Sequence, residues 1–447
     1  MSAMVLQEVE PDANSADTPS MGYKVWFIFI LILLSAVIVG ERRILSVMVQ
    51  PLKHDLHLTD WDIGLFNIAF VMVYVVFSIP IGRLADRSSR RNLIAVSAVI
   101  WSAASLICGS AKSVTMMLVG QAGIGLGEAT TTSPTQSLIT DTFPPNQRGT
   151  AFSIWLLGSS LGLFGGITLG SMLVKSYGWS HAFYYAAIPG FVLAPLAWLT
   201  IRDFRRGFSD GVKKDIAQLP PFWETFKLLM KIRTLPFFIF STMISAFVSM
   251  NMAFWGPAFL ARSHHADSNT VRASLGLALM AGSLIGHLLG GPLADILGRK
   301  DVRAPVWIAL VSGIASASLG FLVFSVPLSA AFWVIAAQSM VSGMSAAPMI
   351  QIVTTLSPAW ARSTALAITM ALINAFGLGL LPALVGRLSD YLTPIYGDGA
   401  LRMALLSGLL MAIPASICCW IASTHYRKDH ADAMVRLGPD PAVPTGH

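Results

Sequence analysis

Long apolar segments separated by short polar breaks follow one another along almost the whole chain. A helix needs about 20 consecutive apolar residues to cross the hydrocarbon core of a bilayer. This criterion predicts twelve spanning helices, at residues 24–49, 61–82, 92–111, 115–139, 149–175, 181–201, 235–260, 271–294, 303–325, 330–355, 361–390 and 400–424. The pattern therefore predicts an all-α membrane protein.

The breaks divide the twelve spans into two sets of six. The longest connection separates the sixth span from the seventh, and its amphipathic end is typical of a helix lying on the membrane surface. Both chain ends are polar, which predicts disordered cytoplasmic tails. The expected units are a tail at 1–21, a six-helix bundle at 22–202, a linker at 203–233, a six-helix bundle at 234–426 and a tail at 427–447.

The two sets of spans also repeat each other in sequence. "GRLADRSSRR" at 82–91 returns as "GPLADILGRK" at 291–300, each time at the end of the second span of its half. "SPTQSLITDTFPPNQRGTA" aligns with "APMIQIVTTLSPAWARSTA", which pairs Pro134 with Pro348 and Arg148 with Arg362. Two marker pairs in the same order predict two pseudo-symmetric bundles, and substrate sites in such repeats lie at the midplane between the halves.

Composition and charge agree with a lipid environment. Of the 447 residues, 54% are hydrophobic and 12% are charged, about half the charged share of a soluble domain. The net charge of +7 comes from Lys and Arg gathered in alternate loops, which places both termini in the cytoplasm and argues against a nucleic-acid partner. We expect a multi-pass protein of the bacterial inner membrane. The three cysteines lie in apolar runs, where they are packing residues, so we expect no metal and no cofactor.

Two segments carry ionisable residues at bilayer depth, where they are costly and mark functional sites. Glu41, Arg42 and Arg43 stand together in the first span, and Glu128 lies in the fourth. At 1.5 Å per residue, both acids fall near mid-depth. Two carboxylates close together in a low dielectric cannot both ionise cheaply, so we expect Glu41 and Glu128 to couple proton flow to transport. Alternatively, the first span ends early and its charges lie at the outer interface.

Arg42 and Arg43 supply countercharge and a grip on an anionic substrate. Further polar side chains at mid-depth are candidates for lining the substrate cavity: Asn67, Tyr74, Asn251, Gln338 and Asn374. For each of these, a hydrogen bond between neighbouring helices is the alternative.

The repeated loop motif predicts a charge cluster at the inner rim. Asp86 lies within reach of Arg90 and of a neighbouring helix N-terminus, where a carboxylate is favoured. Asp141 and Arg148 flank the next inner loop and can join the same cluster. In the second half, Asp295 and Arg299 repeat Asp86 and Arg90. We expect this cluster to hold the halves together on the inner side, the alternative being a basic loop with incidental acids.

Twelve spans in two halves, with the G-x-L-A-D-R-x-x-R-R motif and its echo, resemble the major facilitator superfamily. The segments "ERRILSVMVQPLKHDLHLTDWDIGLF" and "GIGLGEATTTSPTQSLITDTFPPNQRGTAFSIW" resemble its Spinster-like branch. The resemblance implies a proton-linked carrier of sphingolipids, lysophospholipids or other amphipathic organic anions.

The chain departs from this branch at three positions. Glu41 stands where the branch usually has Asp, and Gln121 stands where it usually has Arg, seven residues before Glu128. Arg43 occupies a position that is usually neutral. We therefore include Gln121 among the substrate-binding candidates, with the hypothesis that Arg43 replaces the missing cation.

The sequence contains no ATP-binding loop of the G-x-x-x-x-G-K-[ST] type and no H-E-x-x-H motif. We therefore expect a monomeric secondary transporter that works by alternating access, couples to protons as a symporter, and is not an enzyme. Its expected substrate is an amphipathic or aromatic organic anion, including a lysolipid or sphingoid lipid. The alternatives are a symporter of a small carboxylate or sugar acid, and an intramembrane enzyme or sensor on a carrier scaffold.

Overall fold

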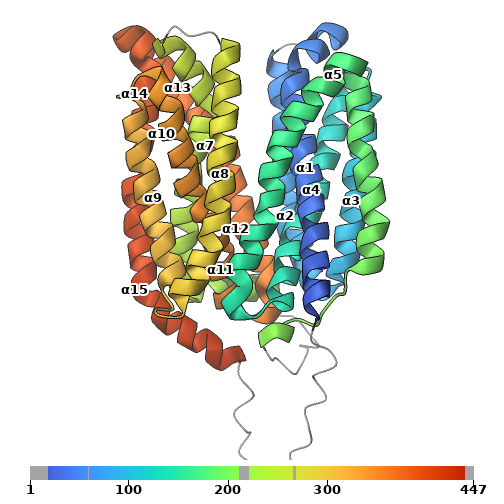
Figure 1. The fold of residues 1–447 in the computed structure, drawn as a ribbon, viewed down its shortest axis with the longest axis vertical. Helices are drawn as coiled ribbons and strands as arrows, with labels where there is room; N and C mark the ends of the chain where they lie inside the picture. The colour runs from blue at the N-terminus through green and yellow to red at the C-terminus, as the bar shows by residue number, and fades with distance from the viewer. Residues whose placement is uncertain (1–18, 59, 211–220, 265–267, 438–447) are drawn as a thin grey trace, which may run out of the picture.

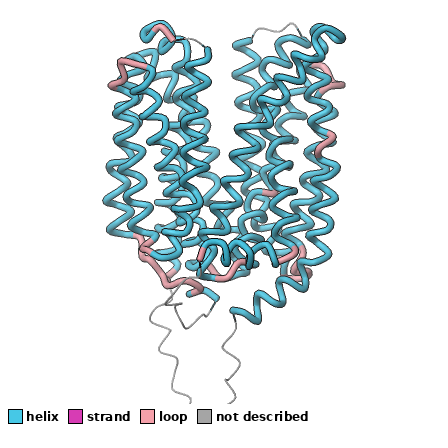
Figure 2. Tube along the Cα trace, turned by 180° about the vertical axis from the view of Figure 1, so that it is seen from behind, coloured by secondary structure: helices cyan, strands magenta, loops and turns pink. Residues whose placement is uncertain are grey.

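The computed structural model describes residues 19–58, 60–210, 221–264 and 268–437, and in these ranges the chain forms helices and loops only (Figure 2). The first half consists of α1 (Met21–Leu56), α2 (Asp60–Arg87), α3 (Arg90–Gly109), α4 (Val114–Thr142), a short turn η1 (Pro145–Gln147) and α5 (Arg148–Thr200). The α5 segment contains two predicted spans. Gly178 separates them with a non-helical backbone of φ 81°.

The linker contributes the turn η2 (Phe208–Asp210) and the helix α6 (Phe222–Lys231). The second half contains α7 (Thr234–His264), α8 (Ser268–Gly298), α9 (Ala304–Val323), α10 (Leu328–Met344), α11 (Ala346–Leu356), η3 (Ala359–Ala361), α12 (Arg362–Asn374), the π-helical η4 (Ala375–Leu380), α13 (Leu381–Tyr396), η5 (Gly397–Gly399), α14 (Ala400–Leu409) and α15 (Ala412–Leu437).

Each of the twelve predicted segments falls on one helix or on consecutive helices. Within the described ranges, eight helices are long and apolar enough to cross a membrane, and a bent pair of α6 with the start of α7 would be a ninth. One of the eight, Pro145–Thr200, holds both the fifth and the sixth predicted spans. The last helix, α15, continues to Leu437, beyond the predicted end of the twelfth span at residue 424.

The two halves stand side by side as separate helical bundles, with α1–α5 in one and α7–α15 in the other (Figure 1). They converge at the end where α1 begins and α15 ends, and they diverge toward the opposite end (Figure 1). We call the converging end, formed by residues 83–91, 141–149, 202–210, 295–303 and 356–364, the basic end.

The apolar core shows the same arrangement. One cluster of buried side chains includes residues of both halves, such as Leu31 and Leu366. Two further clusters are each confined to one half, one around Phe66 and the other around Leu401. Close helix contact between the halves depends on small residues, because a Cβ atom added to Gly82 of α2 would lie 2.8 Å from the carbonyl oxygen of Ser363.

Candidate functional site

Glu128 of α4 and Arg42 of α1 form an ion pair inside the first half. Arg42 Nη1 lies 3.5 Å from Glu128 Oε1, and the side chains are 21% and 15% exposed. The Arg42 guanidinium also lies over the Phe70 ring, 4.4 Å from its centroid. Phe70 in turn stacks on the buried Tyr74, one helical turn further along α2. An ion pair that lies against aromatic rings is suited to binding an anion that also carries apolar surface.

The pair is incompletely satisfied. Glu128 Oε2 is buried and accepts no hydrogen bond within the described part of the chain. The charges of Arg42 and Arg43 both act on Glu128, and Arg42 forms the ion pair with it.

Glu41 lies on a different face of α1. It is 2% exposed, and among the described residues neither of its carboxyl oxygens has a hydrogen-bond partner of normal geometry. Its neighbours are Ser105 and Cys108 of α3. Consecutive residues of an α-helix point about 100° apart, so Glu41 turns away from the side on which Arg42 meets Glu128. In the described ranges no hydrogen bond joins Glu41 to Glu128, and their joint role in proton coupling stays a prediction.

Gln121 shares the surroundings of Glu41. Its Nε2 atom donates to Cys108 Sγ at 3.6 Å, and the side chain is buried. The position at which the Spinster-like pattern has Arg thus faces the Glu41 side of the bundle. The charge of Arg43 acts on Glu128, and its replacement of the cation missing at Gln121 stays a prediction.

The other expected cavity residues divide into separate groups. Asn67 is exposed on α2. Asn374 donates to the Met370 carbonyl oxygen of its own helix at 2.9 Å. Gln338 is buried on α10, and its Nε2 atom lies beside Gly320 of α9, inside the second half. Asn251 lies in α7, and its side chain is outside the described part of the structure.

Two equivalent carboxylates join the halves at the basic end. Asp86, at the end of α2, accepts hydrogen bonds from Ser363 N (3.0 Å), Thr364 N (2.9 Å) and the Thr364 hydroxyl, at the start of α12. Asp295, at the end of α8, accepts from Gly149 N (3.1 Å), Thr150 N (2.7 Å) and Thr150 Oγ1 (2.7 Å), at the start of α5. Each carboxylate binds the first free backbone N–H groups of a helix in the other half, where negative charge is most favourable.

A buried charge cluster lies between these two contacts. Arg362 Nη1 binds Asp141 Oδ1 at 2.9 Å across the two halves, and Arg90 binds the other oxygen of Asp141. Arg148 and Arg362 each donate from Nε to a carbonyl oxygen eight residues earlier, Thr140 and Thr354 respectively. The repeat therefore produces the same arginine geometry in both halves.

The linker contributes further residues to this charge cluster. The sequence analysis predicted the cluster but not this role of the linker. Asp203 accepts from Arg90 Nε at 3.1 Å, and Gly207 N donates to Asp141 Oδ1 at 2.9 Å. Asp210 binds Arg148 Nη2 at 2.7 Å and also binds Arg362. Burial raises the pKa of Asp210, but the charges of Arg362 and Arg148 outweigh this and hold its pKa below its usual range. Acidic residues within a basic linker were the only sequence signal for this role.

Asp86, Arg90, Asp141, Arg148 and Asp295 thus come together as a contact set at the basic end. Asp86 contacts the α12 N-terminus, whereas Arg90 pairs with Asp141 and Asp203 and forms no hydrogen bond or ion pair with Asp86 among the described residues. Arg299 differs from the others, because it is exposed and has no ion pair or hydrogen bond among the described residues.

Two helical bundles joined by reciprocal helix-end contacts, with an unsatisfied acid and two arginines at membrane depth, define an integral membrane transporter. The model of the Major Facilitator Superfamily matches residues 26–382, and the chain belongs to this family. It is therefore a transporter and not an enzyme.

Individual relatives indicate which branch of the superfamily this chain resembles. An MFS-type efflux pump of Mycolicibacterium smegmatis is 30% identical over 400 residues, which cover 87% of this chain and 90% of the pump. The sphingosine-1-phosphate transporter SPNS2 of Danio rerio is 24% identical over 303 residues, 64% of this chain and 60% of that protein. The inward-facing structure of a bacterial homologue of the human lysosomal transporter Spinster has a TM-score of 0.59 at 24% identity, covering 95% of this chain and 100% of that one. Within the superfamily, the chain is similar to Spinster proteins in sequence and in fold.

Proposed function

We propose that the protein is a proton-coupled secondary transporter of an amphipathic or aromatic organic anion, and that the anion binds at Glu128, Arg42 and Arg43. The observation that carries this proposal is the ion pair of Arg42 with Glu128, only partly exposed and lying on the Phe70 ring. Protonation of Glu128 releases Arg42 for an external anion, and deprotonation restores the internal pair. Binding of the proton and binding of the anion therefore favour each other.

The aromatic surroundings favour an anion with an apolar part. Phe70 and Tyr74 present stacked rings beside the Arg42 guanidinium. A relative of this chain is named for transport of sphingosine-1-phosphate, which has an anionic head and a long apolar tail. A small carboxylate or sugar acid would use the charges but would gain little from the rings, and it is the second candidate.

The contacts at the basic end support a mechanism of alternating access. Asp86 and Asp295 hold each half to a helix N-terminus of the other, and opening this end requires both sets of bonds to break. We propose that the basic end faces the cytoplasm of a bacterial cell, with both termini inside, because Lys and Arg gather in its loops. Glu41, buried without a hydrogen-bond partner of normal geometry in the described ranges, is proposed as a second proton site.

The test is uptake into proteoliposomes under an imposed pH gradient, with a panel of lysolipids, sphingosine-1-phosphate and aromatic acids. Glu128→Gln is expected to abolish proton-driven accumulation and to retain substrate exchange, because the neutral amide mimics the protonated acid. Glu224→Gln is the matched control, since Glu224 lies in the first turn of the linker helix α6. Accumulation by Glu128→Gln equal to that of the control would refute the coupling role.

A further inference from the structure

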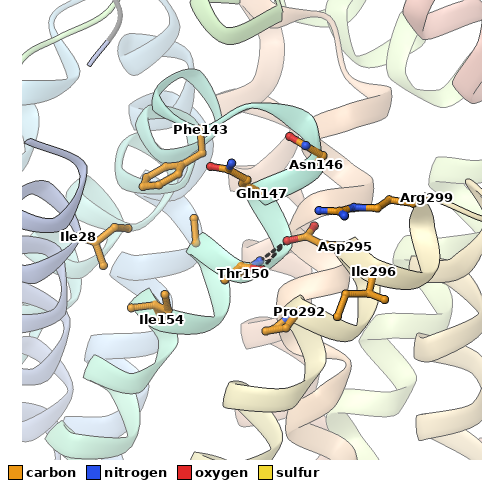
Figure 3. A pocket seen from close by; sticks show the side chains of 11 residues that line it. Ile28, Phe143, Asn146, Gln147, Thr150, Ile154, Pro292, Asp295, Ile296 and Arg299 are labelled. Carbon is orange, nitrogen blue, oxygen red and sulfur yellow. Dashed lines mark hydrogen bonds between the residues drawn. The ribbon is translucent and has the colours of Figure 1, made fainter. Parts of the chain in front are cut away.

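A pocket at the basic end lies between the two halves, at the ends of membrane-spanning helices. It has a volume of about 260 Å³. Its lining combines an apolar wall, including Ile28, Ile154 and Ile296, with Arg299 and the amides of Asn146 and Gln147 (Figure 3). Asp295 also lines it, but both of its oxygens are bound to Gly149, Thr150 and Gln351. Asp295 thus makes its hydrogen bonds elsewhere, and no ion pair joins it to Arg299 among the described residues.

Comparison of the two repeats shows that Arg299 differs from its counterpart in burial and in ion pairing. In the aligned motifs, Arg299 corresponds to Arg90. Arg90 is 0% exposed and binds Asp141 and the linker residue Asp203. The position that corresponds to Asp141 in the second half is Thr355, which carries no charge. The same arginine is thus kept in both halves, while its acidic partner is present only in the first.

The linker accounts for the difference in burial between Arg90 and Arg299. Residues 203–207 cover Arg90, where Asp203 supplies a carboxylate and Phe204 a carbonyl oxygen. Within the described part of the chain, no equivalent segment binds Arg299, and the pocket lies open beside it. An anionic group bound in the pocket would pair with the Arg299 guanidinium, as the Asp203 carboxylate pairs with the guanidinium of Arg90.

The flanking residues identify the anion as part of a lipid. At the positions of Arg87 and Ser88 in the first motif, the second motif has Ile296 and Leu297, which are 58% and 38% exposed. Apolar side chains exposed at the end of a spanning helix suit contact with acyl chains, and a nearby arginine suits a headgroup phosphate. Lys24 Nζ lies 5.6 Å from the ring centroid of Phe143, and Phe143 lines the pocket.

We propose that this pocket binds one anionic phospholipid, with its phosphate on Arg299 and an acyl chain against Ile154 and Ile296. The pocket is lined by α1 and α5 of the first half and by α8 of the second. A lipid bound here contacts both halves where Asp295 joins them, and it therefore favours the state in which the basic end is closed. This inference does not depend on the transported substrate or on proton coupling.

The test is native mass spectrometry of the full chain, delipidated in detergent and titrated with phosphatidylglycerol. We expect one saturable lipid in the wild type, and about a tenfold weaker site in Arg299→Gln, because one hydrogen bond to a charged group is lost. Arg299→Lys should retain part of the affinity and shows that the position tolerates substitution. Lys300→Gln is the matched control, since Lys300 is the adjacent exposed cation and does not line the pocket.

Two further titrations separate a lipid site from simpler explanations. Phosphatidylcholine should bind more weakly than phosphatidylglycerol, and glycerol phosphate without acyl chains should not compete. Equal loss of lipid in Lys300→Gln and Arg299→Gln would show diffuse surface attraction and overturn the proposal. Competition by glycerol phosphate at the same concentration as the lipid would overturn it as well, because the apolar wall would then contribute nothing.

Discussion

The contact between Asp86 and the N-terminus of α12 provides a direct test of how the basic end is held closed. Asp86→Asn keeps the size of the side chain but removes its charge and replaces one acceptor oxygen with a donor. The buried carboxylate accepts from Ser363 N at 3.0 Å, Thr364 N at 2.9 Å and the Thr364 hydroxyl. At least one of these three bonds is lost in the variant, and the favourable interaction with the helix end is lost as well.

The size of the effect follows from these contacts. A hydrogen bond to a charged group contributes about 1.5–3 kcal/mol, and a partly buried charge at a helix terminus contributes up to about 2 kcal/mol. We take roughly 3 kcal/mol for the sum, which corresponds to about a 100-fold shift in the ratio of closed to open basic end. A closed-to-open ratio of about 10:1 in the wild type would then become about 1:10 in Asp86→Asn.

Double electron–electron resonance measures this ratio. Spin labels are placed at the exposed ends of α2 and α8, at Arg87→Cys and Lys300→Cys, after replacement of the native cysteines Cys108, Cys418 and Cys419. Asp86→Asn should move the distance distribution to longer values.

The matched control uses the same chemistry within one half. Asp429 of α15 accepts from Thr234 N at 2.8 Å and Thr234 Oγ1 at 2.7 Å, at the start of α7. Asp429→Asn should leave the distances between the halves unchanged. An unaltered distribution in Asp86→Asn, or an equal shift in the control, would refute the reasoning.

Two further predictions concern the same end of the molecule. Asp210→Asn should open the basic end by breaking a buried pair that costs about 3–5 kcal/mol to disrupt, because Arg148 and Arg362 both lose a partner. Since the pKa of Asp210 is lowered, its contribution is fully present above its ordinary pKa and is lost only as the pH falls through the lowered value, so the difference in spin-label distance between Asp210→Asn and the wild type should be the same at pH 7 and at pH 5; a smaller difference at pH 5 would contradict the assignment. Gly291→Val should also prevent closure, because the added side chain would meet the Gly149 backbone, and overpacking costs about 1–3 kcal/mol. Gly298→Val is its control, since nothing lies within 4 Å of a Cβ atom at Gly298; equal distances in both variants would exclude the steric explanation.

The fold could be predicted from the sequence because hydropathy and repetition are properties of short, contiguous segments. Twelve apolar runs indicate twelve helices, and the aligned prolines and arginines indicate two related halves. Some details remained hidden even at this level. The break at Gly178 inside α5 and the extension of α15 to Leu437 depend on local backbone geometry and packing that hydropathy does not report.

The candidate site could be predicted only in part. Charged residues at bilayer depth are visible in any sequence because they interrupt an apolar run. Which of them meet is set by the direction in which each side chain leaves its helix. Glu41 and Arg42 are neighbours in sequence, yet one faces α3 and the other faces Glu128.

The sequence by itself determined the membrane environment, the helices, the pseudo-symmetry and the identity of the residues at the basic end. Only the tertiary structure decided their partners: Asp86 with Thr364, 278 positions away, Asp210 with two arginines, and Arg299 with none in the described ranges. The physical reason is that local periodicity reports which face of a helix is apolar. The electrostatic partner of a buried charge is selected by the packing of distant helices, which carries no periodic signal along the chain.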